Sequence, residues 1–227
     1  GQYPLYCRTA REGGPEELLL DGDAMGDGKA YFSLAAASQS PDHRLLAYGV
    51  DETGSEFYTL KVRDLSTGRD LPDIITETSS GGVWSADGRY IFYVRLDPNH
   101  RPRWVYCHEL GTASDTDRLV YEEQDPSYFL GIGKTQDEQF ILIRAHEHQT
   151  SEVRLIPAAR PLDAPRLLIA RETGHEYHVE HHSGRLFIHT NKNAEDFRIV
   201  EAPLDNPAPE NWRDVVAHQT GRLILSM

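Results

Sequence analysis

The chain has 227 residues, of which 39% are hydrophobic and 26% are charged, and its formal net charge is −13. No apolar run approaches the roughly 18 residues of a membrane span, no secretory signal is visible, and no Lys/Arg cluster indicates nucleic-acid binding. Cys7 and Cys107 form neither a disulfide framework nor a zinc pattern. We therefore expect an acidic cytoplasmic protein with reduced, mostly buried thiols and with no nucleic-acid or membrane partner.

The predicted elements are short strands, because alternating, β-branched or aromatic runs are separated by Gly, Pro, Asp and Asn. Residues 1–30 contain two such runs, YPLYCRT and EELLLDG. Four later runs follow similar turns: SPDHRLLAYGV from Ser40, SADGRYIFYVR from Ser85, TQDEQFILIRA from Thr135 and HHSGRLFIHTN from His181. The turn positions are spaced by 45, 50 and 46 residues, at Asp42, Asp87, Asp137 and Ser183.

A second strand follows each of these runs. The four segments are LKVRDL at 60–65, VYCHEL at 105–110, VRLIPA at 153–158 and FRIVEA at 197–202, with spacings of 45, 48 and 44 residues. Each repeat also has an apolar run before the turn and another after the second strand. Four strands at this period are typical of a β-propeller blade, which buries its apolar faces against neighbouring blades.

The predicted fold is therefore all-β: a β-propeller fragment of about four four-stranded blades, with a partial blade at each end. The expected blades are 31–78, 80–123, 127–172 and 176–219, with 1–30 as outer strands of an earlier blade and 221–227 as the start of the next. The chain begins with Gly1 and ends inside the strand-like GRLILSM, so we expect an arc cut from a larger ring. Its uncovered apolar faces and free strand edges predict self-association or marginal stability.

The histidine-rich segment GHEYHVEHHSGRLFIHTN, 174–191, raises the possibility of a metal site. A zincin needs HExxH on a helix, but HEYHV has Val179 at the second histidine position. As a strand, the segment places Glu176, His178, Glu180 and His182 on one face and His175, Tyr177, Val179 and His181 on the other. His178 and His182 would then stand about 13 Å apart. Two neighbouring ligands are too few for zinc, so polar residues near a blade edge or channel are the preferred interpretation.

Other apparent motifs are incomplete. GIGKT at 131–135 lacks the first Gly of a phosphate-binding loop, where Tyr128 stands, and it lies between strands. DGDAMGDGKAYF at 21–32 has Met25 and Phe32 at two calcium-ligand positions, so we interpret it as a polar loop. The nucleophile elbow GxSxG is absent. We therefore predict no catalytic residues, no cofactor and no metal ligands, and we leave the substrate-binding residues unassigned.

The sequence resembles the propeller domain of oligopeptidase B, also called protease II, in the prolyl oligopeptidase family. Matching stretches run in family order through nearly the whole chain: YPLYCR at 3–8, EELLLDGD at 16–23, SPDHRLLAYGVDETGSEFYTLKVRDLSTG at 40–68, LPD at 71–73, VWSADGRYIFYV at 83–94, HELGT at 108–112, DRLVYEE at 117–123, TSEVRL at 150–155, GHEY at 174–177 and TN at 190–191. The resemblance also explains the histidine-rich segment as a family blade segment.

This resemblance implies a seven-bladed propeller that caps an α/β-hydrolase domain and excludes folded proteins from its active site. The family enzyme is a serine peptidase that cleaves short peptides after Lys or Arg, using Ser, His and Asp. None of these catalytic residues has a counterpart in this chain. The resemblance thus implies a non-catalytic gating and size-filtering portion, inactive alone, whose partners are the hydrolase domain of the same parent chain and, for the parent, short basic peptides.

Two other hypotheses remain open. The chain could be a free-standing propeller that binds a partner without catalysis, which predicts a natural stop near Met227 and a closed, stable ring. It could also be a metal-dependent enzyme that uses the histidine cluster, which predicts stoichiometric zinc in the purified protein.

Overall fold

The structure, a computed structural model, describes residues 1–227. It consists of strands joined by turns, with three short helical segments: α1 (Gly22–Gly26), η1 (Ser114–Thr116) and η2 (Pro209–Asn211). The chain divides into two compact units, residues 1–119 and 120–227. Helix α1 has five residues, and no helix of the structure is both long and apolar enough to cross a membrane.

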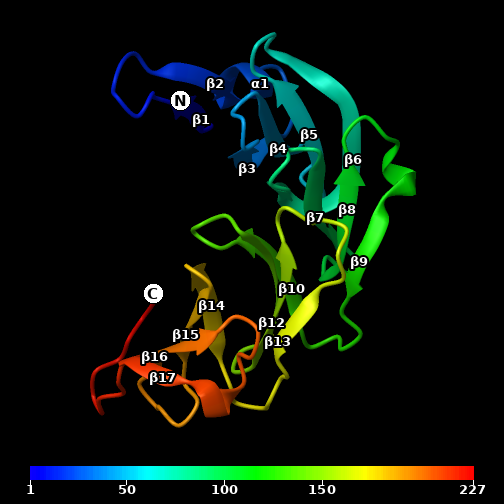
Figure 1. The fold of residues 1–227 in the computed structure, drawn as a ribbon. Helices are drawn as coiled ribbons and strands as arrows, with labels where there is room; N and C mark the ends of the chain where they lie inside the picture. The colour runs from blue at the N-terminus through cyan, green and yellow to red at the C-terminus, as the bar shows by residue number, and fades with distance from the viewer. The chain divides into compact units, whose positions relative to one another are not determined.

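The first unit contains a two-stranded sheet and most of a seven-stranded sheet, both visible in Figure 1. β1 (Leu5–Arg8) pairs with β2 (Glu17–Asp21) in antiparallel fashion. The larger sheet follows chain order: β3 (Ser33–Gln39), β4 (Leu45–Asp51), β5 (Tyr58–Asp64), β6 (Arg69–Trp84), β7 (Tyr90–Leu96), β8 (Pro102–Glu109) and β9 (Arg118–Glu122). Neighbours from β3 to β8 are antiparallel, as expected of a chain of hairpins.

Strand β6 joins two groups of strands that the repeat pattern separates. It runs for 16 residues through the predicted blade boundary at 78–80 and pairs with both β5 and β7. Its register is irregular between Thr78 and Gly82, where the strand bends. The backbones approach closely there: a Cβ on Gly49 would lie 2.3 Å from the carbonyl oxygen of Ser80, and one on Gly81 would lie 2.6 Å from that of Ala36. Glycine is required at such approaches.

The second unit contains two four-stranded antiparallel sheets, each in chain order. In one sheet the strands are β10 (Phe129–Lys134), β11 (Phe140–His146), β12 (Ser151–Pro157) and β13 (Arg166–Ile169). In the other they are β14 (Tyr177–His182), β15 (Arg185–Thr190), β16 (Arg198–Pro203) and β17 (Arg213–Val216), coloured from yellow-brown to red in Figure 1. The predicted second strands of both repeats lie in β12 and β16.

Each unit has its own buried apolar core. In the first unit one core cluster joins β4 to β7, with Ala47, Leu60, Ile75, Trp84 and Ile91 all almost completely buried. In the second unit a cluster packs the two sheets face to face; it includes Leu142, Val153 and Leu155 from one sheet and Tyr177, Val179, Leu186, Ile188 and Val200 from the other. This stacking of four-stranded sheets is the architecture that the repeat predicts, and the all-β propeller prediction is confirmed.

Three of the four predicted turns share one hydrogen-bonding device. The hydroxyls of Ser40, Ser85 and Thr135 donate to the carboxylates of Asp42, Asp87 and Asp137, at 2.6, 2.6 and 2.8 Å. The fourth turn, between β14 and β15, is instead a two-residue hairpin. Ser183 and Gly184 have φ of 51° and 77° there, the left-handed conformation that such a hairpin turn requires.

Three local features differ from the sequence-based expectations. Residues 22–26 form the helix α1 rather than a polar loop, because the Asp21 side chain caps it by accepting from the Ala24 N–H at 2.9 Å. Cys7 is exposed, whereas Cys107 is buried as expected; both are free thiols. Residues 221–227 contain no strand, because the segment is held by isolated hydrogen bonds, such as that from the Ile224 N–H to the Asp196 carbonyl at 3.1 Å, and forms no ladder. The exact division of the chain into blades stays a prediction.

Candidate docking hollow

The histidine-rich segment forms β14, the turn and β15, and its side chains alternate as predicted. Tyr177, Val179 and His181 are buried, whereas His178 and His182 are exposed. The histidines are consequently dispersed among different environments. No three His, Cys, Asp or Glu side chains in the structure come together in an arrangement that could hold a metal ion.

The buried histidines each have a local partner. His175 Nε2 lies 2.8 Å from the Thr190 hydroxyl, and burial lowers the pKa of His175. His181 Nδ1 lies 2.6 Å from a carboxylate oxygen of Asp137, across the two sheets of the second unit. These contacts identify both histidines as structural polar groups, as the sequence-based interpretation of the segment expects.

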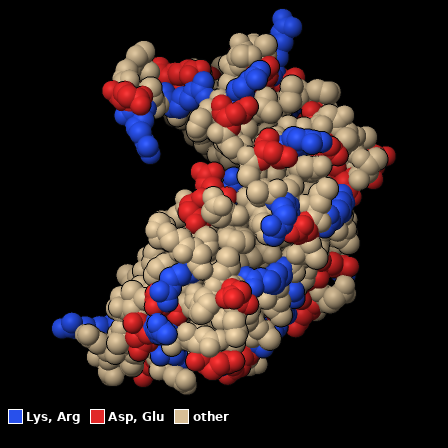
Figure 2. Space-filling view, viewed as in Figure 1, with Lys and Arg blue, Asp and Glu red and all other residues tan.

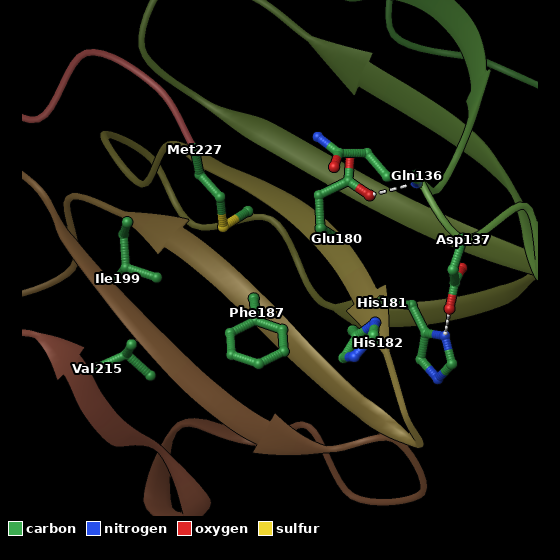
Figure 3. Close-up of a pocket in the computed structure, with 9 residues that line it drawn as sticks. All are labelled: Gln136, Asp137, Glu180, His181, His182, Phe187, Ile199, Val215 and Met227. Atoms are coloured by element: carbon green, nitrogen blue, oxygen red, sulfur yellow. Dashed lines mark hydrogen bonds and ion pairs between the residues drawn. The ribbon is translucent and has the colours of Figure 1, made fainter. Parts of the chain in front are cut away.

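A hollow of about 550 Å³ opens beside β14 in the second unit (Figure 3). Its walls combine polar and apolar side chains: Gln136, Asp137, Glu180, His181, His182, Phe187, Ile199, Val215 and Met227. The polar residues come from the turn after β10 and from β14, and the apolar residues come mainly from β15, β16 and β17. The alternation of β14 turns Glu180 and His182 away from the core and toward the hollow.

Two hydrogen bonds fix the polar wall, and Figure 3 draws both as dashed lines. Glu180 accepts from the backbone N–H of Gln136 at 2.7 Å, and Asp137 pairs with His181. Burial alone would raise the pKa of Asp137, but hydrogen bonds from the Thr135 hydroxyl, the backbone and His181 outweigh burial and lower it. The Asp137 carboxylate therefore stays ionised and holds His181 in place.

The Asp137–His181 pair in this hollow is not part of a catalytic triad. An Asp–His pair can orient a general base, but a triad also needs a nucleophile within hydrogen-bonding distance of the imidazole. No Ser, Thr or Cys lines the hollow. Phe187, Ile199 and Val215 instead provide an apolar floor beside the polar wall, which is the composition of a contact surface.

The first unit contains a buried polar network that sequence reasoning missed. His108 is completely buried; its Nδ1 lies 2.7 Å from Asp117 and its Nε2 lies 3.0 Å from Asp73. Tyr93 donates to the other oxygen of Asp117 at 2.9 Å, and the Gly111 N–H donates to Asp73 at 2.6 Å. The network joins β6, β7, β8 and the segment before β9, so it fixes the sheet rather than forming an accessible site.

One signal of such networks was present in the repeat itself. Tyr48 and Tyr93 stand 45 residues apart, and their partners Asp70 and Asp117 stand 47 apart. The Tyr48 hydroxyl donates to Asp70 at 2.8 Å, as Tyr93 does to Asp117. Aligning the repeats could have paired each tyrosine with its aspartate. The same alignment could not have placed His108 between two carboxylates, because Asp73 is not part of the repeated tyrosine–aspartate pairs.

Charges of both signs are interspersed on the molecular surface shown in Figure 2, where Lys and Arg lie next to Asp and Glu. In the second unit a partly buried cluster also combines positive and negative side chains. Arg171 pairs with Glu123 at 2.7 Å and with Glu152 at 3.3 Å, and Arg154 pairs with Glu152 at 2.8 Å. These arginines neutralise two carboxylates that are almost completely buried.

Comparison with known proteins gives a consistent result. The family described as prolyl oligopeptidase, N-terminal β-propeller domain, matches residues 1–227. Dipeptidyl aminopeptidase BI from Pseudoxanthomonas mexicana is 42% identical over 206 residues, covering 90% of this chain and 28% of that protein. Protease 2 from Moraxella lacunata is 33% identical over 213 residues, covering 90% of this chain and 31% of that protein.

Solved structures show the same relationship. Oligopeptidase B from Leishmania major has a TM-score of 0.87 and 29% identity, covering 96% of this chain and 32% of that chain. Oligopeptidase B from Trypanosoma brucei, in a closed form with covalently bound antipain, has a TM-score of 0.84 and 26% identity over a similar share. The chain thus spans about 30% of the length of the relatives that it matches.

Proposed function

Because this chain belongs to the prolyl oligopeptidase family, as its N-terminal β-propeller domain, we propose that it gates access to the active site of a longer serine peptidase. The observation that carries the proposal is how much of each protein the match covers. The match covers 90% or more of this chain but only 28–32% of each relative described above. The absence of a nucleophile from the hollow of Figure 3 supports a non-catalytic role.

We propose that the partner of this chain is an α/β-hydrolase domain of the same parent protein. The parent would cleave short peptides after Lys or Arg, and the propeller would exclude larger substrates. The net charge of −13 supports a cationic substrate, because an acidic surface attracts basic peptides. We also propose a cytoplasmic location, which two unpaired cysteines favour.

A second activity has one specific observation in its favour. The relative with 42% identity is named a dipeptidyl aminopeptidase, whereas those named protease 2 and oligopeptidase B are 33% and 29% identical. The second proposal is that the parent of this chain releases dipeptides from free amino ends instead of cutting within peptides.

The test compares three substrates with two proteins. The substrates are a short arginine-containing peptide with a free amino end, the same peptide acetylated, and the same sequence inside a folded protein. We expect the 227-residue chain to cleave none of them, and hydrolysis that copurifies with it would contradict a non-catalytic role. The longer protein encoded by the parent gene should cleave the short peptides only.

Two results with the longer protein decide the remaining points. Cleavage of the acetylated peptide after Arg supports oligopeptidase activity, whereas a requirement for the free amino end supports dipeptide release. Equal cleavage of the peptide and the folded protein would contradict the gating role. A gene that ends close to Met227 would contradict the peptidase proposal altogether and favour a free-standing binding module.

A further inference from the structure

A second, smaller hollow of about 210 Å³ in the second unit shares Glu180 and Met227 with the first and is also lined by Leu225 and Ser226. The residues that give it its chemical character are Arg144 from β11, His178 and Glu180 from β14, and His189 from β15. Arg144 and His178 are thus brought together although 34 residues separate them in the sequence. All of these residues belong to one compact unit.

Arg144 is a largely buried cation without a counter-ion. Its Nε is buried and has no hydrogen-bond partner, and no carboxylate lies within ion-pair distance of its guanidinium. Burial lowers the pKa of Arg144, and only the charge of Glu180 acts in the opposite direction. Glu180, however, directs its carboxylate to the Gln136 N–H, as Figure 3 shows. Arg154 and Arg171, in the same unit, both have carboxylate partners.

Two histidine rings lie beside Arg144 in this hollow. The rings of His178 and His189 are stacked with centroids 6.1 Å apart. Partial burial of its ring and the positive charge of Arg144 lower the pKa of His178, although the residue as a whole is exposed, so this imidazole is neutral near pH 7. His189 Nε2 lies 2.9 Å from the Ile224 carbonyl oxygen, while its Nδ1 is buried without a partner. Arg144 thus supplies the fixed positive charge of this hollow, and the Glu180 carboxylate in the same lining is engaged by the Gln136 N–H.

We propose that this hollow binds a carboxylate group of a peptide, with Arg144 as the principal ligand. A buried polar or charged group normally has a partner, and an unpaired guanidinium gains more from an anion than one already paired. The fork of guanidinium N–H groups matches the two oxygens of a carboxylate. One carboxylate also neutralises the single charge of Arg144, whereas a phosphate dianion would bury an excess negative charge. This inference goes beyond gating and does not depend on peptidase activity.

The test measures peptide binding to the 227-residue chain by isothermal titration, with the histidine side-chain NMR signals as a local probe. Two peptides carry one carboxylate each: acetyl-tetraalanine has it at the carboxyl end, and acetyl-Ala-Glu-Ala amide has it on the side chain. Acetyl-tetraalanine amide is the neutral control. We expect one or both charged peptides to bind and to shift the signals of His178 and His189, and the peptide that binds identifies the source of the carboxylate.

The matched variants are Arg144→Gln and Arg213→Gln, which remove one positive charge each; Arg213 is exposed on β17 and outside the hollow. Arg144→Gln should weaken binding about tenfold or more, whereas Arg213→Gln should leave it unchanged. Arg144→Lys, which keeps the charge but not the fork, should give an intermediate affinity and serves if the Gln variant does not fold. Absence of binding, equal binding of the neutral peptide, or full affinity in the folded Arg144 variants would overturn the proposal.

Discussion

At the scale of single residues, His108 shows how a buried imidazole can be held as a cation. Burial by itself lowers its pKa, but hydrogen bonds to Asp117 and Asp73 outweigh burial, and the pKa of His108 is raised. Tyr93 and the Gly111 N–H complete the coordination of the two carboxylates. A protonated His108 donates from both ring nitrogens, so both carboxylates accept a hydrogen bond from the ring only in that state.

The raised pKa predicts a specific pH dependence of stability. The stabilisation is fully present below the unfolded-state histidine pKa, about 6.5, and is lost as the pH rises through the folded-state value. The free energy of unfolding should therefore fall above about pH 6.5, with a slope of at most about 1.4 kcal/mol per pH unit from this one proton. Thermal melting of the wild-type chain and of His108→Gln from pH 6 upward measures it.

The variant His182→Gln is the control, because His182 is exposed and belongs to neither carboxylate pair. It should keep the pH dependence of the wild type. If His108→Gln also keeps the pH dependence of the wild type, Asp73 and Asp117 do not hold His108 in its protonated form.

Sequence reasoning at this scale had clear physical limits. It correctly gave the side-chain alternation of β14, because alternation depends only on strand geometry. It did not find His108 or Arg144, because their environments depend on partners from other strands. Asp73 lies 35 residues before His108, and His178 lies 34 residues after Arg144. Their partners are set by how the sheet folds and not by local spacing.

At the scale of elements, the close approach of β4 to β6 depends on glycine. A Cβ on Gly49 would lie 2.3 Å from the Ser80 carbonyl oxygen, which is backbone and cannot move aside as a side chain can. By contrast, a Cβ on Gly131 in β10 would meet no atom within 4 Å. The two glycines occupy strands, yet only one is required by packing.

Substitution by alanine should have opposite effects on stability at Gly49 and at Gly131. Gly49→Ala should lower the free energy of unfolding by about 1–3 kcal/mol, because the strands must move apart. Gly131→Ala should be neutral or raise it by about 0.5–1 kcal/mol, because alanine loses less conformational entropy in a strand than glycine. Urea unfolding of both variants measures the difference. Equal effects would show that β4 and β6 do not approach so closely.

The strands themselves followed well from the sequence. The four predicted second strands lie in β5, β8, β12 and β16, because each has apolar and polar residues in alternation. The sequence did not predict that β6 is one continuous strand. The boundary expected between residues 78 and 80 falls inside this strand, where Gly81 permits close backbone contact.

At the scale of the whole molecule, apolar side chains that face solvent determine how the isolated chain should behave. Val215 is 51% exposed, Leu223 is 56% exposed and Leu225 is 83% exposed, all in the last part of the second unit. Val215 also forms part of the apolar floor of the larger hollow. Such surfaces favour association, although a net charge of −13 opposes it at low salt.

We therefore expect the 227-residue chain to associate in a concentration-dependent manner, and more strongly when salt screens its charge. Sedimentation velocity at low and high salt measures this. Val215→Glu should reduce association, whereas Leu18→Glu, a substitution at a residue 52% exposed in the first unit, should have little effect. A monomer at all concentrations, or equal effects of the two substitutions, would contradict association through the second unit.

The shared strand β6 also limits how this protein can change in evolution. Because one strand pairs with β5 at its start and with β7 at its end, the two halves of the large sheet have no loop between them. Residues inserted within a paired part of β6, such as 82–84, would shift its register against β7, whereas the loops around residues 160 and 205 can lengthen without disturbing a ladder. Variation in length among relatives should accordingly accumulate in those loops, while residues 69–84 keep a constant length.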